Sequence, residues 1–219
     1  SNDQLWDNAF DNDSKTYKII KLYKDGTGVA KDREKDGHAY VKRQCMHCVD
    51  PACVSACPVS ALVKDPKTGI VSYDKGACIG CRYCQLACPF NVPKFEFEKA
   101  FPQIRKCQLC DHLMKKGEFA ACAKNCPTGA TVFGKVEDLL AEARKRLQYK
   151  PGSRQNYPVE QLGGSARTER EVTPYIQKIY GEKDGGGTQI LTLAGVPFEK
   201  LGLPGLSETS DAKKSETLN

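Results

Sequence analysis

Twelve cysteines are the residues of this chain whose type and spacing could do chemistry, and all of them lie between Cys45 and Cys126. They form three copies of one pattern, in which a Cys-x₂-Cys pair is followed by Cys-x₃-Cys-Pro. The copies occupy residues 45–58, 78–89 and 107–127. The rest of the chain contains no cysteine, so the pattern is the framework of one region that metal or disulfides must hold together.

Three kinds of site could use cysteines in this pattern. Zinc sites take four ligands from Cys-x₂₋₄-Cys pairs, and disulfides need an oxidising compartment. The middle copy, however, matches the C-x₂-C-x₂-C-x₃-C-P ligand run of bacterial ferredoxins residue for residue. The other two copies differ only by an insertion before the third cysteine. We therefore predict [4Fe–4S] clusters, with a structural zinc or disulfide binding module as the alternative.

The spacing also predicts how the ligands are shared. The third and fourth cysteines of each copy are four residues apart, which is about one helical turn with an axial offset of about 6 Å. They should therefore point at two different clusters, as the fourth cysteine of such a run does in two-cluster ferredoxins. Gly80, between the first two cysteines of the middle copy, should let backbone amides approach the cluster. The predicted ligands are Cys45, Cys48, Cys53, Cys57, Cys78, Cys81, Cys84, Cys88, Cys107, Cys110, Cys122 and Cys126.

The composition and the missing motifs argue against nucleic-acid binding and against catalysis. The chain has 219 residues, 40% of them hydrophobic, and a formal net charge of +6. The basic residues are not gathered into runs with stacking aromatics, so no nucleic-acid binding is predicted. A four-iron cluster held by four thiolates carries about −2, which accounts for basic residues beside the ligands. The sequence contains no phosphate loop, dinucleotide motif or nucleophile–base pair, so we predict a non-catalytic role.

The elements that must position the cysteines are short. We predict an α+β fold with a strand at residues 17–23 that ends at a turn at 26–28, and a hairpin of residues 61–63 with 70–73. Further strands are expected at residues 92–95, 130–133 and 188–193, with one amphipathic helix over 136–147. We divide the chain into an N-terminal strand and polar segment (1–44), an iron–sulfur domain (45–150) and an extended Gly/Pro-rich arm for partner contact (151–219). Residues 207–219 are typical of a disordered tail.

The motifs and their flanks resemble a known family. The segments at residues 45–51, 88–93 and 126–130 are similar to the four-cluster ferredoxin-like subunits of membrane-associated oxidoreductases, a family that includes subunits of formate dehydrogenase, dimethyl sulfoxide reductase and nickel–iron hydrogenases. The flanks at 26–29, 42–47, 180–189 and 195–199 narrow the resemblance to the iron–sulfur subunits of hydrogenase-2. Such subunits carry another cysteine motif upstream and a membrane helix downstream. We therefore expect the given chain to be incomplete at its N-terminus.

The resemblance implies a ligand assignment in which the first two motifs share their fourth cysteines. One cluster would be held by Cys45, Cys48, Cys53 and Cys88, and a second by Cys78, Cys81, Cys84 and Cys57. A third would be held by Cys107, Cys110 and Cys122 with an upstream ligand, and a fourth by Cys126 with upstream ligands. Two clusters would then be complete in this segment, and up to four in the intact subunit.

The resemblance also implies a role and a location. The chain would relay electrons from a nickel–iron hydrogenase to an integral membrane, quinone-linked subunit. Its partners would be the small and large hydrogenase subunits and that membrane subunit. The chain would face the periplasm at the inner membrane. The alternative within the same class is an iron–sulfur subunit of a molybdopterin oxidoreductase, of the formate dehydrogenase or sulfur/sulfoxide reductase type.

Overall fold

The computed structural model describes residues 11–24 and 38–216, in two compact units. The first unit comprises the described residues up to Gln108, together with Gly181–Ile190 and the described residues from Val196 onward. The second comprises Leu109–Tyr180 and Leu191–Gly195. The division of the chain at residues 44 and 150 that the sequence suggested stays a prediction. The turn predicted at residues 26–28 lies outside the described residues.

The strands of the first unit pair two by two, and all of these pairs are antiparallel. The strands are β1 (Ile19–Lys24), β2 (His38–Arg43), β3 (Leu62–Lys64), β4 (Val71–Tyr73), β5 (Lys94–Phe95) and β6 (Ile104–Arg105). β3 and β4 pair with Leu62 opposite Tyr73, which confirms the hairpin predicted between the first two cysteine motifs. The Asp65 side chain accepts hydrogen bonds from the amides of Lys67 and Thr68, which closes the turn between them.

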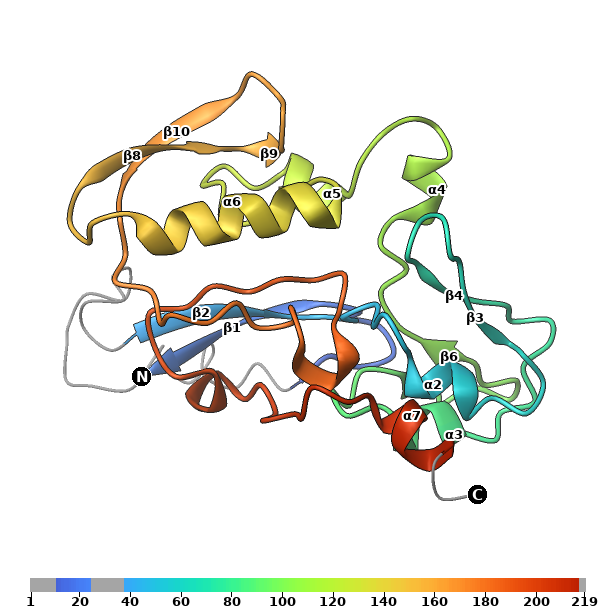
Figure 1. Cartoon of the computed structure of the whole chain (residues 1–219). Coiled ribbons are helices and arrows are strands. Elements are labelled where there is room, and N and C mark those ends of the chain that lie inside the picture. The colour runs from blue at the N-terminus through green and yellow to red at the C-terminus, as the bar shows by residue number, and fades with distance from the viewer. Residues whose placement is uncertain (1–10, 25–37, 217–219) are drawn as a thin grey trace, which may run out of the picture. The chain divides into compact units, whose positions relative to one another are not determined.

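Short helices lie within the cysteine motifs of the first unit. They are α2 (Ala52–Ser55) and α3 (Tyr83–Leu86). The C-terminal part of the chain adds the 3₁₀ turns η2 (Asp184–Gly186) and η3 (Phe198–Leu201) and the helix α7 (Asp211–Glu216). α2 contacts both α3 and α7 (Figure 1). The two helices that carry the third cysteines of their motifs are therefore neighbours, which matters for how the ligands are shared.

The second unit contains the longest helix of the described chain, α6 (Val136–Gln148). Glu137 and Asp138 lie in its first turn and Lys145 and Arg146 in its last, an arrangement that favours the helix dipole. The helix confirms the amphipathic pattern predicted over residues 136–147. The other elements of the unit are α4 (Asp111–Met114), α5 (Ala121–Lys124), β7 (Val132–Phe133), β8 (Arg154–Pro158), β9 (Glu160–Gln161) and β10 (Arg167–Glu171). β8 pairs with β10 antiparallel, and β7 pairs with β9 in parallel.

Two predictions for the C-terminal part were wrong. The strand expected at residues 188–193 has only single bridges, at Thr188 and Thr192. The amide of Gln189 instead bonds to carbonyls of the first cysteine loop, so this backbone is used outside a strand ladder. The tail expected from residue 207 is ordered through residue 216, because Ala212 on α7 is buried and Ser210 donates a hydrogen bond to Asp50. Among the described residues, no helix is long and apolar enough to cross a membrane.

Candidate functional site

Four cysteines of the first unit form a buried group that we call set A: Cys45, Cys48, Cys53 and Cys88. Burial, together with the nearby thiols of Cys45 and Cys88, raises the pKa of the Cys48 thiol to about 12. The same two thiols and burial also raise the pKa of Cys53. Three members therefore come from the first motif and one, Cys88, from the second. The neutral thiol is favoured here unless a positive charge compensates the thiolates.

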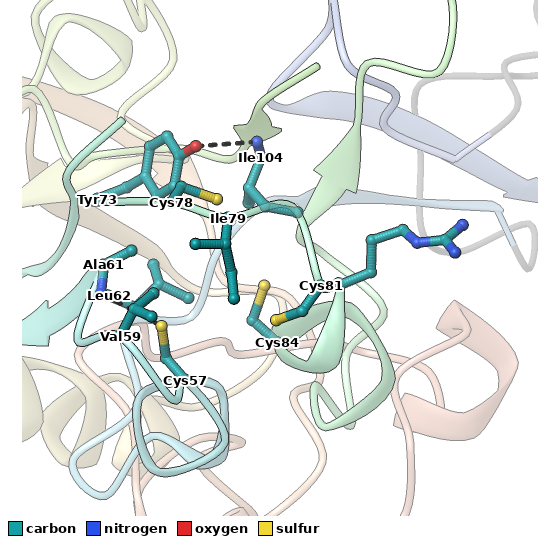
Figure 2. A pocket seen from close by; sticks show the side chains of 11 residues that line it. Cys57, Val59, Ala61, Leu62, Tyr73, Cys78, Ile79, Cys81, Cys84 and Ile104 are labelled. Atoms are coloured by element: carbon teal, nitrogen blue, oxygen red, sulfur yellow. Dashed lines mark hydrogen bonds between the residues drawn. The ribbon is translucent and has the colours of Figure 1, made fainter. Parts of the chain in front are cut away.

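Four other cysteines form set B: Cys57, Cys78, Cys81 and Cys84. All four line one pocket of about 300 Å³, a volume that includes its opening to solvent. Figure 2 shows their sulfur atoms around this pocket, with Ile79 among them. Burial and the thiols of the other three members raise the pKa of Cys84 to about 11. Three members come from the second motif and one, Cys57, from the first.

An apolar core lies between the two sets. Cys53 of set A and Cys84 of set B belong to one buried cluster with Leu62, Val71 and Ile104. The third cysteine of each of these motifs lies in a four-residue helix, α2 or α3, and the fourth follows that helix after one intervening residue. Because α2 and α3 are neighbours, the third cysteine stays with its own motif and the fourth reaches the other set.

All three motifs have a left-handed residue two positions after the first cysteine. His47, Gly80 and Leu109 have φ angles of 47°, 73° and 51°. This conformation turns the loop tightly, and it is costly for residues other than glycine unless surrounding contacts fix it. Gly80 thus has the left-handed φ that glycine adopts readily, while the approach of backbone amides to a cluster at this loop stays a prediction. His47 and Leu109 adopt the same conformation without the freedom of glycine.

A second left-handed residue follows the fourth cysteine by three positions in every motif. These residues are Ser60, Asn91 and Gly129, with φ angles of 51°, 52° and 64°. Successive amides around a left-handed residue form a concave donor site for an anion. In each loop the group that can accept these hydrogen bonds as an anion is the thiolate of the fourth cysteine.

The amides of these loops act on the sulfur atoms. The amide of Ala61 donates a hydrogen bond of 3.2 Å to Cys57 Sγ. Burial opposes ionisation of Cys57, but this amide and those of the neighbouring loop residues outweigh it and lower the pKa of its thiol. The pKa of Cys126 is lowered in the same way, against burial, by a hydrogen bond from Thr128 and by loop amides. Loop amides also act on Cys88, although burial prevails there and raises its pKa. Donors to sulfur of this kind stabilise thiolate ligands and bound clusters.

The donor sets fit [4Fe–4S] clusters better than single ions. All twelve cysteines lie in the described part of the chain and are free thiols. Among the described residues, no group of three or more His, Cys, Asp or Glu side chains is arranged to hold one metal ion. A zinc ion would need its sulfur ligands within about 2.3 Å. Each set instead gathers four buried or partly buried thiols, and those of set B line a pocket. Four thiolates so close together need a positive core for charge compensation.

His47 and Tyr73 support the sets from outside the ligand list. His47 is fully buried, and its Nδ1 accepts a hydrogen bond of 3.0 Å from the amide of Val71. Burial and the cations of Lys106 and Lys64 lower its pKa to about 3, so the ring is neutral. The hydroxyl of Tyr73 accepts a 3.2 Å hydrogen bond from the amide of Ile104 (Figure 2). Burial and a hydrogen bond with Cys78 raise the pKa of Tyr73 to about 12.

The third motif extends over both units. Cys107 is buried in the first unit, whereas Cys110, Cys122 and Cys126 belong to the second. Its local structure repeats that of the other motifs, since Cys122 lies in the four-residue helix α5 and Cys126 follows it. The assignment of these four residues to a third and a fourth cluster stays a prediction.

Sequence reasoning missed several residues that support the site. The contact of Tyr73 with set B and those of Lys64 with the first cysteine loop have no local signal, because each depends on residues distant in the sequence. The left-handed loops did have one signal. Each fourth cysteine is followed by proline and then, three positions after the cysteine, by a turn-forming residue: Ser60, Asn91 or Gly129.

The chain matches one family model and resembles individual known proteins. Residues 37–136 match the family described as 4Fe-4S dicluster domain. The chain is 50% identical to the hydrogenase-2 operon protein HybA of Escherichia coli O157:H7, over 99% of this chain and 67% of that protein. It is 34% identical to a formate dehydrogenase iron-sulfur subunit of Haemophilus influenzae, over 65% of this chain and 44% of that protein. These matches support [4Fe–4S] clusters as the cofactor and give no support to zinc or structural disulfides.

Proposed function

Because this chain belongs to the family of the hydrogenase-2 operon protein HybA, we propose that it is the electron-transfer subunit of a nickel–iron hydrogenase complex. The observation that carries this proposal is the presence of two separate sets of four buried or partly buried cysteines, each combining three residues of one motif with one of the other. Two adjacent redox sites in one small unit suit a relay. We further propose that the chain itself catalyses no reaction.

The ligands follow from the two sets. Cys45, Cys48, Cys53 and Cys88 would hold one [4Fe–4S] cluster, and Cys57, Cys78, Cys81 and Cys84 would hold another. Bound clusters of this type supply one-electron oxidation and reduction. The third motif would complete further clusters with residues outside the given sequence.

The protein's own residues exclude water and donate hydrogen bonds at these sites. Leu62, Val71 and Ile104 pack between the sets and are nearly inaccessible to solvent. Loop amides donate to Cys57, Cys88 and Cys126. A dry, fixed donor environment reduces the rearrangement that accompanies a change of charge, which favours a relay over a site that binds substrate.

Exposed apolar side chains beside set B support association with other subunits. Ile79 lines the pocket of set B, and its side chain is 66% exposed. Tyr83 and Leu86 of α3 are also exposed, and Leu86 is 83% accessible. Phe97, which contacts Phe95 next to this loop, is exposed as well. Large exposed apolar surfaces are typical of protein interfaces. The proposed partners are the hydrogenase subunits and a quinone-linked membrane subunit, on the periplasmic side of the inner membrane.

The test is anaerobic purification of the complex from its native source through a tag on this chain. Iron, acid-labile sulfide, zinc, nickel and molybdenum would be quantified, and the reduced sample examined by electron paramagnetic resonance. We expect iron and sulfide in equal amounts, signals of reduced [4Fe–4S] clusters and co-purifying nickel. Molybdenum in place of nickel would favour the alternative, an iron–sulfur subunit of a molybdopterin oxidoreductase. A colourless, zinc-containing protein would overturn the electron-transfer proposal.

The location has its own test. A protease added to intact spheroplasts should digest the chain if it faces the periplasm. Protection equal to that of a cytoplasmic marker would contradict this part of the proposal.

A further inference from the structure

Two lysines send their ammonium groups into the first unit beside set A. The first is Lys64, at the end of β3. Its Nζ donates to the carbonyl oxygens of Cys48 and Gly69, both at 2.7 Å, and of His47 at 3.3 Å. An ammonium has three N–H donors and a neutral amine only two. Three carbonyl acceptors therefore match the charged form of Lys64.

The second is Lys106, next to the third cysteine motif. Its side chain is buried, with only 3% of the residue exposed. Its Nζ donates to the carbonyl oxygen of Val71 on β4 and to that of Cys107 at 3.3 Å. A buried ammonium is costly unless a negative charge compensates it.

Within the described chain, no carboxylate lies within ion-pair distance of Lys64 or Lys106. The negative groups that act on Lys64 are the thiols of set A in their ionised form and the carboxylate of the neighbouring Asp65. Lys64 is within electrostatic range of Cys45, Cys48 and Cys53. Lys106 lies within electrostatic range of Cys53, and Val71, which accepts its hydrogen bond, also donates to His47 of the first cysteine loop. The two lysines are therefore placed to compensate the charge of whatever set A holds.

Among the described residues, set B has no such buried lysine, although the exposed Arg82 lines its pocket. The strongest influences on Cys84 are burial and the other three thiols of its set. The support of set B comes from hydrogen bonds, which Tyr73 makes with Cys78 and Ala61 makes with Cys57. The cation of the set B loop, Arg82, is exposed and lies over the rings of Phe95 and Phe97 at 5.7 and 5.5 Å. The two sets thus differ in buried positive charge.

We propose that the ammonium groups of Lys64 and Lys106 selectively raise the reduction potential of the cluster held by set A. The proposal rests on the proposed function, because it needs a cluster on these four cysteines. Reduction adds one electron to the cluster and breaks no bond. The added negative charge is stabilised by fixed cations nearby, and burial limits the screening of this interaction by salt. Removal of either ammonium should therefore disfavour the reduced form.

The experiment compares single variants of the holoprotein by potentiometric titration with dithionite and mediators, followed by electron paramagnetic resonance. Lys64→Met and Lys106→Met keep the length of the side chain and remove its charge. Each should lower the equilibrium constant for reduction of the set A cluster about tenfold, which corresponds to about 59 mV for one electron. The set B cluster should keep its potential. Signals are assigned to the two sets with Cys88→Ser and Cys57→Ser.

Two controls separate charge from structure. Lys106→Arg retains the positive charge and should retain the potential. Lys75→Met removes an exposed lysine of the same unit and should shift neither cluster. If Lys106→Met fails to load clusters, Lys64→Met and Lys64→Gln carry the test.

Unchanged potentials in fully loaded Lys64→Met and Lys106→Met proteins would overturn the inference and leave the ligand assignment intact. Equal shifts of both clusters would also overturn it, because the effect would not be selective for set A. Wild-type protein without iron and sulfide would instead overturn the proposed function itself.

Discussion

The Nδ1 atom of His47 accepts a hydrogen bond of 3.0 Å from the backbone N–H of Val71, and this bond ties the first cysteine loop to strand β4. His47 is fully buried and has a left-handed φ of 47°. From the loop that supplies Cys45 and Cys48, the imidazole thus satisfies a buried amide of β4. In the sequence His47 stands between Cys45 and Cys48. Its burial and its hydrogen bond with the Val71 amide give it a packing and hydrogen-bonding role.

Replacing His47 by leucine should destabilise the protein. Leucine leaves the Val71 amide without its acceptor, which costs about 1–3 kcal/mol for a buried donor, and it tolerates the left-handed conformation poorly. His47→Asn keeps a side-chain acceptor and a residue that adopts this conformation more readily. Denaturant unfolding of the loaded proteins, followed by circular dichroism, should rank wild type above His47→Asn and His47→Asn above His47→Leu. Equal stability of the two variants would contradict the role of this hydrogen bond.

Exchanging a fourth cysteine should affect the cluster of the other motif. Cys88→Ser is expected to disturb the cluster that contains Cys45, Cys48 and Cys53, although Cys88 belongs to the second motif. Cys57→Ser should disturb the cluster of Cys78, Cys81 and Cys84. The signals of the reduced clusters and the iron content would be compared with those of Cys45→Ser and Cys78→Ser. If Cys88→Ser resembles Cys78→Ser rather than Cys45→Ser, the two motifs do not share ligands in this way.

Glu96 should make stability depend on acid pH. Its carboxylate pairs with Lys99 at 2.6 Å and with Arg105 at 2.8 Å. The hydrogen bond from Lys99 lowers the pKa of the Glu96 carboxyl most strongly. Burial raises this pKa, but the hydrogen bond from Arg105 lowers it further, so the pKa stays below its usual value. The stabilisation is therefore present above the ordinary glutamate pKa of about 4.3 and is lost as the pH falls through the lower pKa of the folded state.

The measurement is the difference in unfolding midpoint between wild type and Glu96→Gln across this range. Wild type should be the more stable at pH 7, and the difference should shrink at acid pH. Glu98→Gln is the matched control, because Glu98 pairs with Lys15 while both side chains are about 80% exposed. A difference for Glu96→Gln that stays constant with pH would contradict the prediction.

Helix α7 should detach when its buried face becomes charged. Ala212 is 2% exposed, and α7 contacts α2, which carries Cys53. Ala212→Asp places an unpaired carboxylate at this contact, which is unfavourable. Limited proteolysis should then cleave the C-terminal segment faster than in wild type, whereas the exposed Lys213→Asp should leave the rate unchanged. Equal cleavage of both variants would show that Ala212 does not anchor the helix.

The amino-acid sequence by itself determined the local features of the site. The spacing of Cys78, Cys81, Cys84 and Cys88 carries the ligand pattern, because a tight loop and one helical turn are set by residues close together. The same holds for the β3–β4 hairpin and for α6, whose periodicity and end residues lie within one segment. The sequence was misleading at residues 188–193, where β-branched and apolar residues are typical of a strand but make only isolated bridges.

Only the tertiary structure decided which distant groups meet. The neighbourhood of α2 and α3 brings Cys88 to set A and Cys57 to set B, and no local spacing fixes that neighbourhood. The hairpin carries Lys64 to the carbonyls of the first cysteine loop, and the chain after β6 carries Lys106 to Val71. These ammonium groups look like ordinary surface cations in the sequence. They are covered by segments distant in the sequence, so their exposure is decided only when the unit is assembled.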